Sequence, residues 1–365
     1  MRGYQGSNYK PTATSIRGAQ GTSLRQKTRV GTLHITSTPP VGWPLTVKSE
    51  MNIGKWEEAL SKANLLPELQ GVIDGFLHGF DQGIPNHGIS AMRWYTPDNH
   101  SSAILAKEKI QASIFSRSGG KKNSAEFFKQ NLGPFTLALF DWEKAYRQGS
   151  DENGPMAFLM VKDLDDGLFV DTRITFGGVA GCGSFGIPAD AWKRINGSRI
   201  DVVKIFRWVD DNLFIKSPNA SVTISDVVSR SLDLGVQTNE GKCSEFSDEQ
   251  KFIGFVWNGK DSTVRLPKAK LDLRITQIEV FLVPKAQFKF NDAEVLAGRL
   301  NHVSYLLPPL RCYLRGVYRW MNEWKKIMAT RTVPDDVFLD LVFWVETLAS
   351  FEHTRLVPSS RAGRN

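Results

Sequence analysis

The stretch that decides the fold is Val202-Val-Lys-Ile-Phe-Arg-Trp-Val-Asp-Asp-Asn-Leu-Phe-Ile-Lys216. Its two apolar flanks are rich in β-branched and aromatic residues, which favour strands. The pattern therefore predicts a β-hairpin that carries the adjacent carboxylates Asp210 and Asp211 at its tip. Because an unpaired carboxylate packed against apolar surface costs on the order of several kcal/mol, this acidic pair needs a partner. A bound divalent cation is one such partner.

The composition is that of an ordinary globular chain, but its charge is unevenly distributed. Of the 365 residues, 41% are hydrophobic and 23% are charged, and the net charge is +8. Residues 1–49 hold seven Lys or Arg and no acid, and residues 352–365 hold three Arg and one Glu; subtracting these seven and two charges from eight leaves −1 for residues 50–351. Nucleic-acid binding by the body of the chain would therefore depend on local basic stripes.

Two classes of protein are disfavoured by the sequence. No apolar run approaches the ~18 residues that span a bilayer, and the N-terminus has no apolar signal core, so we expect an intracellular protein without a membrane segment. Cys182, Cys243 and Cys312 are far apart and match no zinc spacing, which argues against a disulfide scaffold and a structural zinc site.

A second carboxylate ends another predicted strand. Phe135-Thr-Leu-Ala-Leu-Phe-Asp141 is rich in strand-forming residues and passes into a short helical turn, Trp142 to Gln148. A sheet could bring Asp141 beside Asp210 and Asp211. Carboxylates are the hard oxygen ligands that Mg²⁺ needs, and two-metal sites hold their ions ~3.5 to 4 Å apart. We therefore predict that these three aspartates hold two Mg²⁺ ions, or Mn²⁺ in their place.

Hydrophobic periodicity and turn residues predict the surrounding elements. We expect two helices within 56–80 broken at Pro67, a hairpin of 156–161 with 167–175, helices over 189–195 and 224–234, and a helix capped at Asn291-Asp-Ala-Glu294.

A further helix follows Pro308-Pro309 and has an apolar and a basic stripe. The apolar stripe comprises Leu310, Leu314, Val317, Met321 and Trp324, and the basic one Arg311, Arg315, Arg319 and Lys326. Such a basic stripe either follows a phosphate backbone or is a solvated helix face.

Five motifs in a fixed order carry a family resemblance. They are Phe140-Asp-Trp-Glu-Lys-Ala-Tyr-Arg-Gln148, Phe176-Gly-Gly178, Val209-Asp-Asp211, Gly235-Val-Gln-Thr-Asn-Glu-Gly-Lys242 and Phe252-Ile-Gly-Phe255. Over about residues 70–350 the chain resembles reverse transcriptases, specifically those of fungal retrotransposons of the DIRS-like, tyrosine-recombinase type.

The resemblance implies roles for individual residues. Asp141 and Asp210 would be the main metal ligands, with Asp211 the less essential neighbour, and Lys242 would be a general acid or charge stabiliser for the leaving pyrophosphate. Tyr146 would be the gate that excludes a 2′-hydroxyl.

Further roles concern the substrate and the nucleic acid. Gly177 and Gly178 would lie along the template and the incoming nucleotide. Phe252, Gly254 and Trp257 would belong to the primer grip. Arg311, Arg315 and Arg319 would contact nucleic acid from the thumb.

The implied fold is α+β, a right-hand polymerase with an antiparallel palm sheet and flanking helices. Its expected parts are a disordered basic arm (1–45), shortened helical fingers (46–130), the palm with the catalytic aspartates (131–265), thumb or connection helices (266–351) and a disordered tail (352–365).

The first functional hypothesis is an RNA-directed DNA polymerase that acts on an RNA or DNA template with a primer and dNTPs. The alternative is an inactive retroelement-derived remnant that binds nucleic acid. The three aspartates, Tyr146 and Lys242 favour the enzyme. The short stretch between Phe115 and Phe135, where no motif holds the triphosphate, favours the remnant. An RNA-dependent RNA polymerase is a third hypothesis, and Tyr146 argues against it.

Overall fold

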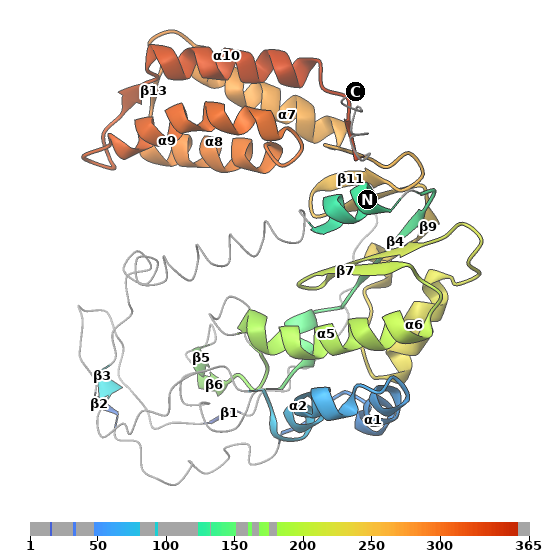
Figure 1. Ribbon diagram of the computed structural model, residues 1–365. Helices are drawn as coiled ribbons and strands as arrows, with labels where there is room; N and C mark the ends of the chain where they lie inside the picture. Colours follow the sequence, from blue (N-terminus) through green and yellow to red (C-terminus); the bar gives the residue numbers. More distant parts are fainter. Residues whose placement is uncertain are drawn as a thin grey trace, which may run out of the picture. The chain divides into compact units, whose positions relative to one another are not determined.

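The computed structural model (Figure 1) describes the chain over most of its length. Described in full are residues 47–80, 123–131, 133–150, 171–174 and 181–356; of five short strands only the backbone is described, namely β1 (Ser15–Ile16), β2 (Thr32–Leu33), β3 (Met92–Arg93), β5 (Met160–Lys162) and β6 (Leu168–Val170).

The chain divides into two compact units. Unit 1 comprises Met1–Ile114, Phe140–Asp201 and Val222–Cys243; unit 2 comprises Phe115–Leu139, Val202–Ser221 and Ser244–Asn365. The division cuts across the stretch 131–265 that we predicted as a palm, so those subdomain boundaries stay predictions.

The helices of unit 1 include four α-helices, which are α1 (Ile53–Lys62), α2 (Leu66–His78), α5 (Gly181–Arg199) and α6 (Ile224–Asp233). The predicted helix pair within 56–80 is confirmed. Pro67 lies in the first turn of α2, where its missing N–H leaves no helical hydrogen bond unmade. The helix α5 starts within the glycine-rich stretch, before the predicted Ala189.

Aromatic rings form the centre of unit 1. Trp192 of α5 lies with its ring centroid 4.6 Å from that of Phe140 and 5.6 Å from that of Trp142. Its indole N–H donates to Ser231 Oγ of α6 at 3.1 Å. These contacts bind α5 and α6 to the segment that carries Asp141.

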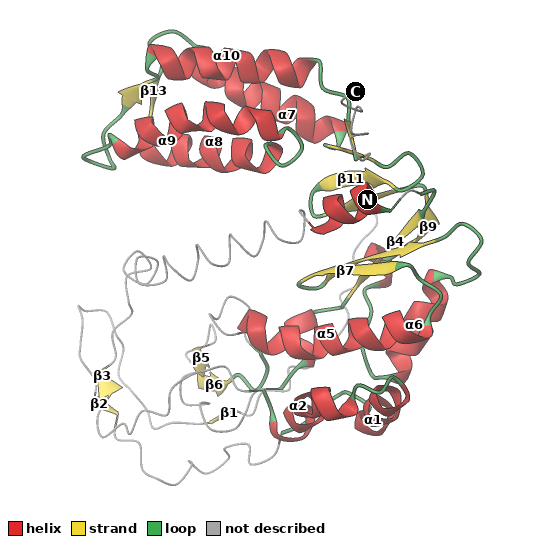
Figure 2. Cartoon of the chain, in the orientation of Figure 1, coloured by secondary structure: helices red, strands yellow, loops and turns green. Residues whose placement is uncertain are grey.

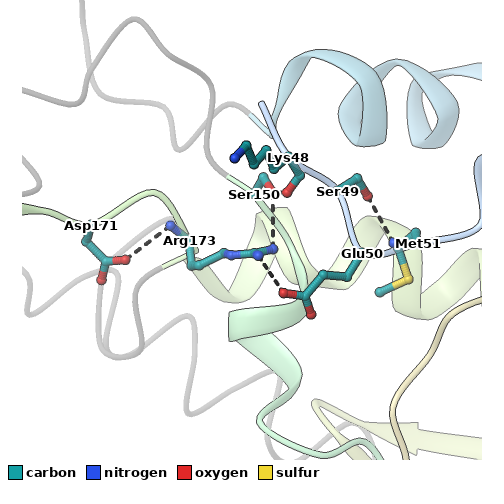
Figure 3. Close-up of polar contacts among 7 residues, drawn as sticks. All are labelled: Lys48, Ser49, Glu50, Met51, Ser150, Asp171 and Arg173. Carbon is teal, nitrogen blue, oxygen red and sulfur yellow. Dashed lines mark hydrogen bonds and ion pairs between the residues drawn. The ribbon is translucent and has the colours of Figure 1, made fainter. Parts of the chain in front are cut away.

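Arg173 of unit 1 lies at the centre of a polar network with Glu50, Ser150 and Asp171 (Figure 3). The guanidinium donates to Glu50 Oε1 at 2.6 Å and to Ser150 Oγ at 3.4 Å, while the backbone N–H donates to Asp171 Oδ1 at 3.1 Å. Ser150 Oγ in turn donates to the carbonyl oxygen of Lys48 at 2.8 Å. The segment before α1 is thereby tied to the residues that follow Gln148.

Unit 2 contains two four-stranded sheets. The first has the order β7-β8-β4-β9, and the second has the order β10-β11-β12-β15. Their strands are β4 (Thr136–Asp141), β7 (Lys204–Trp208), β8 (Asp211–Lys216), β9 (Ser244–Ser247), β10 (Glu249–Phe252), β11 (Phe255–Asn258), β12 (Thr263–Arg265) and β15 (Thr354–Arg355). The last two residues of β4 belong to unit 1.

The predicted hairpin of the opening stretch is confirmed. The strands β7 and β8 pair in antiparallel fashion, with Trp208 opposite Asp211. The other predicted hairpin is also present in outline, because β5 and β6 pair in antiparallel fashion.

A helical bundle completes unit 2 (Figure 2). It contains α7 (Lys268–Glu279), α8 (Phe290–Val303), the 3₁₀ helix η5 (Pro308–Tyr313), α9 (Leu314–Asn322) and α10 (Asp335–Ala349). Helices with antiparallel sheets confirm the α+β fold class.

Three sequence expectations about unit 2 need correction. The helix α8 has Lys289 as its N-cap, two residues before the predicted cap Asn291, and Asp292 Oδ2 accepts from the backbone N–H of Lys289 at 2.9 Å. Arg311 lies in η5 and α9 ends at Asn322, so Lys326 falls beyond the helix. The predicted tail begins too early, because β15 pairs with β12.

The remaining expectations about the ends of the chain lie largely outside the described residues. Only β1 and β2 are described within the predicted basic arm, each as a two-residue strand. Within the described ranges, every helix is too short or too polar to span a bilayer.

Candidate functional site

Asp141 ends strand β4 and lies in the interior of unit 1. It is 3% exposed, and Lys242 Nζ lies 3.2 Å from its Oδ2. The Lys242 side chain is 63% exposed, so the ammonium approaches this carboxylate from the solvent. Asp141 and Lys242 are thus joined within one unit, although they are predicted from separate motifs.

The loops that carry these two residues are joined backbone to backbone. The N–H of Asn239 donates to the carbonyl oxygen of Asp141 at 2.9 Å, and Trp142 forms an isolated β-bridge with Thr238. Burial raises the pKa of the neighbouring Cys243 thiol, and a hydrogen bond to the Asp141 backbone offsets part of this rise. Cys243 therefore stays a neutral thiol beside the carboxylate at neutral pH.

Gln148 is a residue that the sequence analysis missed. Its Nε2 donates to the carbonyl oxygens of Glu143 at 2.5 Å and Gln237 at 2.9 Å, and its Oε1 accepts from the N–H of Gln237 at 2.9 Å. The side chain therefore clamps the turn after Asp141 to the segment before Lys242. The available signal in the sequence was a polar residue at the end of the motif Phe140 to Gln148.

Tyr146 lies in the 3₁₀ helix η1 (Ala145–Gln148) and is 8% exposed. Its ring stacks on Phe185 of α5, with centroids 5.1 Å apart and planes at 27°. The adjacent Arg147 donates to both carboxylate oxygens of Asp171, at 2.7 and 2.5 Å. The Tyr146 ring is thus packed against α5, and the residue after it is anchored by an ion pair.

The tip of the β7–β8 hairpin is a two-residue turn, Val209-Asp210. Val209 has a φ of +57°, a left-handed conformation that is rare for a β-branched residue. Its carbonyl oxygen accepts from Arg207 Nη1 at 3.0 Å. Asp210 is half-buried and Asp211 is exposed, so both carboxylates lie at a strained and accessible tip.

Asn212 is the second residue that the sequence analysis missed. It is fully buried, and its Nδ2 donates to the carbonyl oxygen of Asp210 at 2.8 Å. This bond closes the turn from inside the sheet. The only signal in the sequence was an amide among apolar strand residues.

No protein-family model matches the chain, and no curated protein matches it. Among solved structures, it is similar to a foamy viral protease-reverse transcriptase in complex with RNA/DNA hybrid, with a TM-score of 0.49, 14% identity, and coverage of 61% of this chain and 28% of that chain. A second structure of this kind, in complex with dsDNA, gives a TM-score of 0.46 and 13% identity, with 62% and 44% covered. Both are viral protease-reverse transcriptases.

The chain spans less than half the length of either structure. At these identities and TM-scores, the likeness assigns neither family nor activity to it. The retrotransposon type named by the sequence motifs stays a prediction.

The donor chemistry of the aspartates fits Mg²⁺, because carboxylate oxygens are its preferred protein ligands. Among the residues that the structure describes, no three His, Cys, Asp or Glu side chains are grouped so that they could hold a metal ion. The two-metal site made from Asp141, Asp210 and Asp211 therefore stays a prediction. Gly177 and Gly178, predicted to line the nucleotide, lie outside the described residues.

The predicted primer grip is a tight turn between β10 and β11. Both of its central residues have positive φ, +49° at Ile253 and +82° at Gly254, which is the pattern of a type I′ hairpin turn. Phe252 and Trp257 are each 2% exposed, and the Trp257 indole N–H donates to the carbonyl oxygen of Phe252 at 3.0 Å. The two side chains fill the core beneath the turn, and their role in a primer grip stays a prediction.

The predicted basic stripe is exposed at Arg311, Arg315 and Arg319. Arg311 lies over the Tyr305 ring at 4.9 Å, and Arg319 forms an ion pair with Asp336 of α10. Two of the three guanidinium groups are thus engaged within the unit. Their contact with nucleic acid stays a prediction.

Proposed function

We propose that the chain is an RNA-directed DNA polymerase derived from a retrotransposon, which adds dNTPs to the 3′ end of a primer on an RNA or DNA template. The observation that carries this proposal is the buried Asp141 carboxylate at the end of β4, with the Lys242 ammonium 3.2 Å away. The motif order supports it further. A carboxylate at a strand end with an exposed cation beside it is suited to phosphoryl transfer, where the protein supplies mainly position and charge.

Asp141 and Asp210 would hold Mg²⁺, with Asp211 as a lesser ligand. When bound, the ions would supply activation of the primer 3′-hydroxyl and stabilisation of the leaving pyrophosphate. From its solvent-side position, Lys242 would donate a proton to that pyrophosphate or stabilise its negative charge. The Tyr146 ring, packed on Phe185, would leave no room for a 2′-hydroxyl.

The test is primer extension by the purified chain on an RNA template with dNTPs and Mg²⁺ or Mn²⁺, beside Asp210→Asn. We expect extension by the wild type and a loss of about 10²-fold or more in the variant, because one transition-state electrostatic contact is commonly worth this much. Nucleic-acid binding without extension under any condition would favour the inactive remnant instead. Equal extension by both proteins would refute the assignment of Asp210.

Tyr146→Ala tests the gate separately. We expect increased incorporation of ribonucleotides relative to deoxyribonucleotides, measured with single nucleotides on the same template. An unchanged sugar preference would refute the gate role while leaving the polymerase proposal intact.

A further inference from the structure

A small pocket lies in unit 1, between one face of α1 and the C-terminal ends of α5 and α6. Its volume is about 210 Å³, and its lining includes neither the candidate catalytic aspartates nor the lysine beside them. Six charged side chains surround it, namely Lys55, Glu58, Lys62, Arg199, Arg230 and Asp233. We call it the helix-end pocket.

The walls of the helix-end pocket are fixed to one another by buried contacts. Trp56 of α1 is buried, and its indole N–H donates to the carbonyl oxygen of Leu234, just after α6, at 2.8 Å. The N–H of Asn52 donates to the same oxygen at 3.0 Å. The pocket therefore keeps its shape through bonds that do not involve its charged side chains.

The charges around the pocket do not balance. Its lining has four cations and two carboxylates, which leaves an excess of two positive charges. One carboxylate, Glu58, is shared by two cations, because both Lys62 and Lys55 donate to it, the latter at 3.1 Å. Hydrogen bonds from Lys62 and Lys55 lower the pKa of this carboxyl to about 2, so it is ionised at neutral pH.

The two arginines lack an acidic partner. Among the residues that the structure describes, no carboxylate forms an ion pair with Arg199 or Arg230. The Nη1 of Arg230 is buried and has no hydrogen-bond partner there. Burial lowers the pKa of the Arg230 guanidinium and the charge of Arg199 lowers it further, while Asp233 acts in the opposite direction. Because a buried donor without a partner destabilises the fold, this group needs an acceptor.

Cations at helix C-termini also have an ordinary role, in which they bond the last carbonyl groups and complement the helix dipole. Backbone N–H groups already fill that role here. The carbonyl oxygens of Asn196 in α5 and Ser231 in α6 accept from backbone N–H groups at 3.0 and 2.8 Å. Within the described part of the chain, the side chains of Arg199 and Arg230 donate to no carbonyl oxygen. Their N–H groups therefore stay available to a ligand.

We propose that the helix-end pocket binds a small molecule that carries a phosphate monoester. At pH 7 such a group has a charge of about −1.5 to −2, which matches the excess of positive charge. The planar guanidinium group fits two phosphate oxygens at once. The volume of the pocket is about seven times the ~30 Å³ that one water occupies. Ala59, Ile195 and Leu234 also line it and offer apolar surface to a short carbon skeleton.

The test is isothermal titration calorimetry of the full chain with glycerol phosphate, without divalent ions. We expect saturable binding at one site per chain and no binding of glycerol, which lacks the charge. Inorganic phosphate should bind several-fold more weakly, because it leaves the apolar lining uncovered. No binding of glycerol phosphate, or equal binding of glycerol, would overturn the proposal. Equally tight binding of inorganic phosphate would overturn the carbon skeleton as part of the ligand.

Arg199→Gln and Arg230→Gln each remove one cation from the pocket. We expect each to bind glycerol phosphate about tenfold more weakly or worse, since hydrogen bonds to charged groups are commonly worth this much. The matched control is Arg194→Gln, which removes an arginine of α5 that pairs with Glu68 outside the pocket. It should bind within about twofold of the wild type. Equal losses in all three variants would contradict the assignment.

Two further comparisons keep the result clear. Arg199 is exposed, so Arg199→Gln should keep the thermal unfolding of the wild type. Unchanged binding by this folded variant overturns the proposal, whether or not Arg230→Gln folds. Lys242→Gln should keep binding of glycerol phosphate; loss there with retained binding by Arg230→Gln would move the ligand to the candidate catalytic site. Primer extension tests the polymerase proposal separately, because the pocket shares no residue with that site.

Discussion

At the scale of the residue, Val209 has a left-handed backbone conformation, which its β-branched side chain disfavours. A left-handed conformation costs an L-residue roughly 1 to 3 kcal/mol, and glycine avoids this cost but loses roughly 0.5 to 1 kcal/mol of chain entropy. We therefore expect Val209→Gly to raise the free energy of unfolding by about 1 kcal/mol, measured by urea denaturation.

Val203→Gly is the control for this prediction. Val203 is 43% exposed, has no positive φ and donates its N–H to the carbonyl oxygen of Ile215 at 2.8 Å. Its replacement should lower the free energy of unfolding by about 0.5 to 1 kcal/mol. Equal losses at both positions would show that the turn at Val209 is not strained.

Asp340 of α10 should make stability depend on pH. Burial raises the pKa of its carboxyl above the ordinary value, and Arg319 offsets only part of the effect. The folded state therefore favours the protonated acid: this stability is fully present below the unfolded pKa of about 3.9 and is lost as pH rises through the raised folded pKa.

Asp340→Asn should thus be more stable than the wild type at pH 7, and the difference should shrink as pH falls toward about 4. Urea denaturation at both pH values measures this, with Glu346→Gln on the exposed face of the same helix as the control. A gain for Asp340→Asn that is the same at both pH values would contradict the burial of its charge.

At the scale of the element, Gln148 holds two loops together through three hydrogen bonds to backbone groups. Each such bond contributes roughly 0.5 to 1.5 kcal/mol, and the orphaned buried groups add to the loss. Gln148→Ala should therefore lower the free energy of unfolding by about 2 to 3 kcal/mol. If the proposed function holds, extension should fall as well, because Asp141 and Lys242 lose their common support.

Gln70→Ala is the matched control in unit 1. Gln70 makes one exposed bond, from Nε2 to Asp74 Oδ1 at 3.3 Å. Its loss should change the free energy of unfolding by no more than about 0.5 kcal/mol. Comparable effects of the two substitutions would rule out the clamp.

At the scale of the whole molecule, each unit has a core of its own, so we expect two separable unfolding transitions in calorimetry. Substitutions at two glycines, one in each unit, should each shift the unfolding transition of that unit only. Gly235 of unit 1 has a φ of +80°, and a Cβ there would lie 2.7 Å from the carbonyl oxygen of Glu50. Gly298, in the interior of α8 in unit 2, has open space around it.

Gly235→Ala should destabilise only the transition of unit 1, by about 2 kcal/mol or more, since both strain and a clash arise. Gly298→Ala should stabilise only the transition of unit 2, by about 1 kcal/mol. A single transition that both substitutions shift would show that the units unfold together.

Local patterns in the sequence predicted a large part of this fold. The alternation around Asp210 identified the hairpin, and helical periodicity identified α1, α2 and α6. Two expectations failed for different reasons. The helix α8 begins two residues earlier than the Asx pattern indicates, because Asp292 accepts from the backbone N–H of Lys289. The pairing of β15 with β12 was missed because it joins residues far apart in the sequence.

The sequence by itself determined which residues are candidates for a catalytic site, because carboxylates at strand ends and an acidic hairpin tip are recognisable from short stretches. Only the tertiary structure decided how they are supported. It brought Lys242 to Asp141 and joined their loops through Gln148. It also buried Phe252 and Trp257 beneath the turn between β10 and β11. Contacts between distant residues depend on how whole elements pack, and no periodicity in a single stretch records that.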